Sequence, residues 1–185
     1  MLEYRFPPEE PKDYPEYFKD ISARGYATSP ECGKAIEAAE LWVAHNQSSI
    51  RRPETLRDMI VKLMPYRWAG TIFHDLWEKA VRSISDLPVP EQIALWRAVF
   101  DPANHGETSV PQSGKAQAIL VQWETLADSP AQASDILTSS FRQDCPLSRE
   151  WLALAAGLDI WLMQNGSKAS LLNALLESPA GKAME

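Results

Sequence analysis

The sequence predicts an all-α protein, a compact bundle of about eight helices preceded by an extended N-terminal arm. Almost every segment after residue 28 repeats apolar residues with the helical period of 3.6. No segment shows the alternation or β-branched enrichment of a strand for more than a few residues. A short stack of α-hairpins is the alternative arrangement, but the tryptophans are unequally spaced and indicate no repeat.

Length and composition favour one folded domain. The chain has 185 residues, of which 45% are hydrophobic and seven are tryptophan, enough to bury a large aromatic core without disulfides or metals. We expect an arm over 1–28, a single helical domain over 29–178 and a flexible tail over 179–185. The arm holds four of the five tyrosines and four prolines, which fix its path and supply rings for packing.

Four helices are expected before residue 101, and prolines mark most of their ends. Ser29-Pro30 combines a capping residue with a proline at the first helical position. Pro65 and the Asp101-Pro102 pair stop the second and fourth helices, because proline cannot continue a helix. The expected ranges are about 30–46, 53–65, 67–85 and 90–100.

Four more helices are expected after the loop 101–112, the longest segment without apolar periodicity and a candidate functional loop. A serine precedes each, and its hydroxyl can cap the free N–H groups of a first helical turn. These serines are Ser113, Ser129, Ser148 and Ser167. Asn165-Gly166 closes the helix that begins near Ser148, since glycine readily adopts the left-handed conformation found after helix ends.

The charge distribution disfavours general nucleic-acid binding. The net charge is -7, and residues 101–185 carry ten acids against five bases. An acidic surface repels a phosphate backbone, although it suits a partner protein with a basic surface. A basic cluster on and beside the second expected helix is diluted by acids, as is usual on an exposed helix face. It comprises Arg51, Arg52, Arg57, Lys62 and Arg67.

The two cysteines, Cys32 and Cys145, are far apart and belong to no C-x-x-C motif. We therefore expect reduced thiols in a cytoplasmic protein, with no metal centre and no cofactor. The start of the chain lacks the pattern of a signal peptide. The longest apolar stretch, 151–163, is interrupted by Asp159 and is too short to cross a bilayer, so no membrane association is expected.

The segment HDLWE, from His74 to Glu78, raises the possibility of a catalytic or metal site, because His74 and Glu78 share one side of a helix. On a helical wheel, however, His74 lies at the rim of a broad apolar arc and both acids face outward. Lys79 and Arg82 follow Asp75 and Glu78 by four residues, which is favourable for ion pairs.

A zinc hydrolase motif would need a second histidine on this helix. Remote His45 or His105 could complete a site only after folding. A small metal-dependent or hydrolytic enzyme using His74 and Glu78 is therefore kept as the alternative to a binding protein. A nucleic-acid-associated regulator acting through the basic cluster is a weaker alternative.

The sequence thus favours a non-enzymatic protein-interaction module, such as an adaptor, a secretion-system accessory or chaperone, or an inhibitor that neutralises a toxin. Aromatic and arginine side chains are enriched at interfaces between proteins. The expected partner-binding residues combine the aromatics of the arm with the basic cluster and the tryptophan beside it. They are Tyr14, Tyr17, Phe18, Arg51, Arg52, Arg67 and Trp68.

Overall fold

The computed structural model describes residues 16, 19, 30–49, 51–63, 71–105 and 110–183, with backbone alone at 30–32, 71–75, 78 and 149. All regular elements within these ranges are helical, as the sequence predicts. The α-helices are α2 Pro30–Gln47, α3 Pro53–Leu63, α4 Thr71–Ile84, α5 Val89–Val99, α6 Ser113–Leu126, α7 Pro130–Phe141, α8 Arg149–Gln164, α9 Leu171–Leu176 and α10 Pro179–Lys182. A short 3-10 helix, η2, covers Pro102–Asn104.

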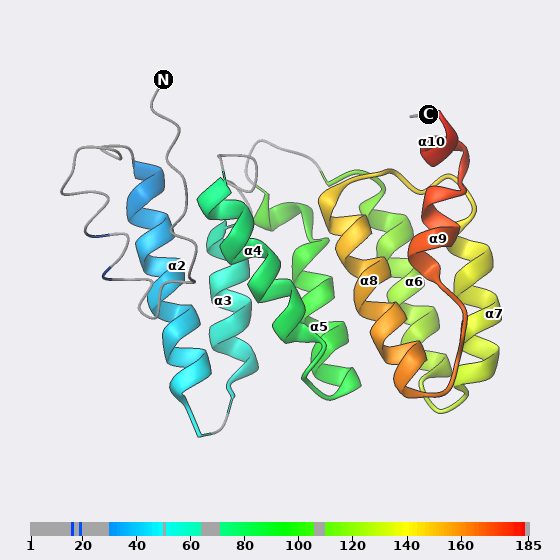
Figure 1. Ribbon diagram of the computed structural model, residues 1–185, viewed down its shortest axis with the longest axis horizontal. Helices are drawn as coiled ribbons and strands as arrows, with labels where there is room; N and C mark the ends of the chain where they lie inside the picture. The colour runs from blue at the N-terminus through cyan, green and yellow to red at the C-terminus, as the bar shows by residue number, and fades with distance from the viewer. Residues whose placement is uncertain are drawn as a thin grey trace.

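The longer helices stand side by side, with α2 at one end of the molecule and α7 at the other (Figure 1). Along this series α2 packs against α3, α3 against α5, α5 against α6, and α6 against α7. Helix α4 also packs directly on α8, although the α6–α7 hairpin separates them in sequence. Repeats in a hairpin stack contact only their neighbours, so this contact identifies a compact bundle.

Tryptophans dominate the core, as the composition predicts. Trp96, Trp123 and Trp151 are fully buried, and Trp77 and Trp161 nearly so. The Trp151 ring meets the rings of Phe100 and Phe141 edge to face, with centroids 5.6 and 5.8 Å apart. These contacts join α5, α7 and α8 at their apolar faces. The aromatic and leucine side chains of α8 therefore form core rather than a ligand pocket.

Both ends of α8 form as the sequence predicts. Ser148 caps α8, since its Oγ accepts a hydrogen bond from the Trp151 N–H. Gly166 has a φ of 80°, and the N–H groups of Gly166 and Ser167 donate to the carbonyls of Met163 and Leu162. This pair of bonds is the Schellman motif, which satisfies the last carbonyls of α8.

Two predicted serine caps, Ser113 and Ser167, are wrong, and a third, Ser129, is confirmed in its position but not in its hydrogen bond. Ser113 lies inside α6, whose capping position belongs to Gln112 in a left-handed conformation. Ser129 occupies the capping position of α7, but its ψ of 66° lies outside the extended region that aims a capping hydroxyl at the first turn, and its side chain makes no capping bond. Ser167 completes the turn that ends α8, so α9 starts later and Ser170 caps it.

Two details concern the C-terminal end of the described chain. Leu176, the last residue of α9, is 48% exposed where the chain turns into α10. The tail expected after Ser178 includes the one-turn helix α10, which the Ser178 hydroxyl caps by accepting from the Gly181 N–H. No helix in the described ranges is long and apolar enough to span a membrane.

Candidate functional site

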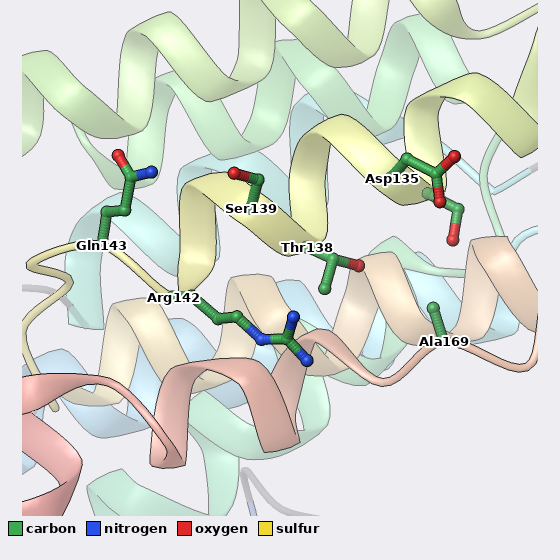
Figure 2. Close-up of a pocket in the computed structure, with 7 residues that line it drawn as sticks. Asp135, Thr138, Ser139, Arg142, Gln143 and Ala169 are labelled. Carbon is green, nitrogen blue, oxygen red and sulfur yellow. The ribbon is translucent and has the colours of Figure 1, made fainter.

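A polar groove of about 410 Å³ lies beside α7, facing the connection between α8 and α9. Six of its seven lining residues are of polar or charged types: Ser134, Asp135, Thr138, Ser139, Arg142, Gln143 and Ala169. Figure 2 shows Thr138 and Arg142 projecting from α7 toward the segment that holds Ala169. Asp135, Ser139, Arg142 and Gln143 are exposed, so the groove is open to solvent along one side.

The sequence of α7 creates this groove through its helical spacing. Ala133, Leu137 and Phe141 are fully buried and hold one face of α7 in the core. Residues spaced three and four apart share a helix face, so the intervening polar residues form a second stripe. Six of the seven lining residues belong to α7 or the two residues after it. The groove is thus a polar helix face beside a second segment.

Three interactions fix the opposite wall, the connection from Gly166 to Ser170. The Schellman motif sets its start, and the hydroxyls of Ser134 and Ser167 lie 3.0 Å apart, which joins the connection to α7. Asp159 of α8 sets its end, because its carboxylate oxygens accept hydrogen bonds from the Leu171 and Leu172 N–H groups at 2.6 and 3.1 Å. A wall held at both ends gives the groove a defined width.

Opposite charges mark the two ends of the polar stripe. Asp135 lies on α7 and Arg142 directly follows its last residue. The two are seven residues apart, which corresponds to about 10 Å along a helix. The Arg142 guanidinium lies 3.7 Å from the Glu177 carboxylate, and both side chains are about 60% exposed. An exposed pair of this kind contributes about 0–1 kcal/mol, so Arg142 retains most of its capacity to donate to a ligand.

Thr138 differs from its neighbours in the groove. Its Oγ1 is buried and has no hydrogen-bond partner within the described residues. The hydroxyl therefore cannot reach a molecule in the groove, whereas the exposed side chains of Ser139 and Gln143 can. Thr138 contributes to the floor of the groove by its shape.

Cys145 lies just beyond the groove and is fully buried. Its Sγ donates weakly to the Ser140 carbonyl at 3.4 Å. Burial raises the pKa of the thiol, and nearby Asp144 raises it further, whereas Lys115 acts in the opposite direction. A buried, protonated thiol is a poor nucleophile, so Cys145 acts as a core residue.

The described histidines serve the fold. His45 is 1% exposed, and its Nδ1–H donates to the Arg52 carbonyl at 3.1 Å, which ties the end of α2 to the start of α3. His105 is equally buried and donates from Nε2 to the Val99 carbonyl at 2.6 Å, closing the end of α5. The side chains of His74, Asp75 and Glu78 lie outside the described set. No cluster of three potential metal ligands occurs among the side chains that are described.

One buried acid escaped notice in the sequence. Glu150 is fully buried in the first turn of α8, two residues after the capping Ser148. The positive end of the helix dipole stabilises a carboxylate at this position. Its place in the first turn indicates a role in holding the start of α8.

Part of the expected partner-binding surface can be located. Arg51 and Arg52 are exposed at the start of α3, and Arg51 pairs with Asp86 at 2.5 Å. Lys62, at the other end of α3, lies 2.7 Å from Glu37 of α2. These pairs join α3 to neighbouring segments, and α3 lies far from α7 (Figure 1). The remaining expected residues, Tyr14, Tyr17, Phe18, Arg67 and Trp68, fall outside the described ranges.

The groove residues were missed because no sequence motif marks them. A helical wheel of 130–141 would have shown a stripe of serine and threonine between Asp135 and Arg142. The facing segment that turns this stripe into a groove is visible only after folding. No protein family, curated protein or solved structure with which the chain was compared matches it.

Proposed function

We propose that the protein is a non-catalytic interaction module that binds a segment of another protein. The groove between Asp135 and Arg142 carries this proposal, because it is open, polar and oppositely charged at its ends. An adaptor, a chaperone-like accessory and a toxin-neutralising inhibitor all act by such binding. The acidic balance of residues 101–185 favours a partner with a basic surface around the contact.

Among the described residues, the roles of two histidines and one cysteine also support binding rather than catalysis. A general base or nucleophile must reach the substrate within hydrogen-bonding distance. His45, His105 and Cys145 are instead buried and contact backbone carbonyls of their own fold. Their chemistry is therefore directed at stabilising helix ends.

We propose a cytoplasmic location for this activity. Cys145 is a free thiol in the core, and free thiols persist in reducing compartments. Antibody staining of the tagged full-length protein in the cells that express it would test the location. Recovery in an extracellular or oxidising compartment would contradict it.

The binding proposal is tested by affinity capture with the immobilised full-length protein in nuclease-treated cytoplasmic extract. We expect one or a few proteins to be retained in stoichiometric amounts. Two variants locate the contact: D135K/R142E changes the groove at constant net charge, and Y14S/Y17S/F18S changes the predicted arm. Absence of any stoichiometric partner would contradict the proposed function.

A further inference from the structure

We propose that the groove beside α7 binds an extended peptide segment with one basic and one acidic side chain three residues apart, the basic one against Asp135 and the acidic one against Arg142. This inference rests on the proposed function and names its ligand. A segment in the extended polyproline II conformation rises about 3.1 Å per residue with three residues per turn, so side chains three residues apart lie on the same side, about 9 Å apart. The backbone positions of Asp135 and Arg142 are separated by a similar rise, about 10 Å, along α7 and its C-terminal end.

Charge complementarity selects this ligand over a simple anion. Arg142 and the Ser139 hydroxyl would suit a phosphate group, but Glu177 lies 3.7 Å from Arg142 and Asp135 lines the other end. A free anion would face both carboxylates. A segment with both signs of charge places a cation against Asp135 and satisfies Arg142 with its carboxylate.

The open shape selects a peptide segment over a free small molecule. Sites for small ligands bury most of the ligand surface. Here four of the seven lining residues are exposed, and the groove follows α7 for two turns. A segment in an extended conformation fits such a shallow channel. The exposed Ser139 hydroxyl and Gln143 amide can then bond the peptide backbone between its two charged side chains.

Glu177 competes with the ligand carboxylate for Arg142, and this competition can be tested by substitution. In the free protein the Glu177 carboxylate forms an ion pair with the Arg142 guanidinium. A ligand carboxylate has to share or displace it. Glu177→Gln should therefore tighten peptide binding, by up to about fivefold given the small free energy of an exposed pair. Arg142→Met should weaken binding about tenfold.

The experiment selects phage-displayed random nonapeptides on the purified full-length protein. Affinities of the enriched peptides are then measured by fluorescence polarisation. We expect enrichment of Lys or Arg and Asp or Glu three positions apart, in one preferred order. The D135K/R142E variant should enrich the opposite order, because both contacts are reversed. Thr125→Val is the control: Thr125 is exposed on α6 and does not line the groove, so its change should leave affinity within about twofold.

Enriched peptides without paired charges would overturn the inference, as would equal binding to wild type and D135K/R142E at matched thermal stability. Failure here is distinguishable from failure of the proposed function. A cellular partner captured equally by wild type and D135K/R142E would leave the binding function standing and place the contact elsewhere. Absence of a partner would contradict the function itself.

Discussion

The Asp159 carboxylate of α8 accepts a hydrogen bond from the Leu171 N–H at 2.6 Å, so one helix caps the next. Its second oxygen accepts from the Leu172 N–H, and the Ser170 hydroxyl donates to the same carboxylate. A charged acceptor at the start of a helix satisfies free N–H groups and complements the helix dipole. The acid that interrupts the apolar stretch of α8 therefore positions α9, whose approach shapes the groove.

Asp159→Ala should lower the free energy of unfolding by about 1–2 kcal/mol, because the first N–H groups of α9 lose their acceptor. Urea unfolding followed by circular dichroism measures the change. Asp128→Ala is the matched control: Asp128 is exposed near the end of α6 and should change stability by less than about 0.5 kcal/mol. Equal effects of the two substitutions would contradict the capping role.

His45 should make stability depend on pH. Burial lowers the pKa of His45, and Arg51 lowers it further, while the bond to the Arg52 carbonyl and nearby Asp86 act in the opposite direction. Its Nε2 is buried without a partner among the described residues, so protonation places an uncompensated charge in the core. The unfolded state then binds more protons than the folded state between the lowered pKa and about 6.5.

Stability should therefore fall as the pH drops below about 6.5, with a slope of at most about 1.4 kcal/mol per pH unit from this group, and level off below the folded pKa. Urea unfolding between pH 5 and 8 measures the slope. His45→Gln should remove this contribution. An identical pH dependence in the two proteins would show that the His45 pKa is not lowered.

Gly157 permits the close approach of α8 to Trp96 of α5. A Cβ at position 157 would lie 3.1 Å from the Trp96 ring, which is fully buried and has little room to move. Gly157→Ala should therefore destabilise the protein by about 1 kcal/mol or more, even though alanine favours helices. Gly114→Ala adds a Cβ in open space within α6 and should be neutral or stabilising by up to about 1 kcal/mol. Thermal melts compare them, and a stabilised Gly157→Ala would contradict the tight contact.

Trp151 joins the core to the segment before α6, because its Nε1–H donates to the Pro111 carbonyl at 2.8 Å. Trp123 is equally buried, but its Nε1 has no acceptor in the described part of the chain. Trp151→Phe loses a hydrogen bond as well as volume, whereas Trp123→Phe loses volume alone. Trp151→Phe should therefore cost about 1 kcal/mol more in unfolding free energy. Equal losses of unfolding free energy in chemical denaturation would contradict a stabilising role of this hydrogen bond.

Thr138→Val should leave stability unchanged or raise it by up to about 1 kcal/mol. The buried hydroxyl lacks a partner among the described residues, and valine replaces it with a methyl group of similar size. Ser134→Val is the contrasting change, since the Ser134 hydroxyl contacts that of Ser167, and it should be destabilising. Differential scanning calorimetry compares the two. A destabilised Thr138→Val would indicate a hydrogen bond to the hydroxyl.

The sequence predicts most helices well because their signals are local. Pro53, the proline after Ser129 and Gly166 act within about one turn of their own position, and the starts of α3 and α7 and the end of α8 agree with them. Serines are less reliable, as Ser113 and Ser167 show. A hydroxyl caps a helix only when the backbone places it over the first turn, which depends on how the preceding segment arrives.

By itself, the sequence determined the fold class and the apolar faces that form the tryptophan core. These follow from periodicity, because the burial of an apolar stripe does not depend on which neighbour covers it. Only the tertiary structure decided that α4 meets α8, that Asp159 caps α9 and that the stripe from Asp135 to Arg142 faces a second segment. Each of these brings together residues distant in sequence, and such contacts arise from how complementary helix surfaces pack.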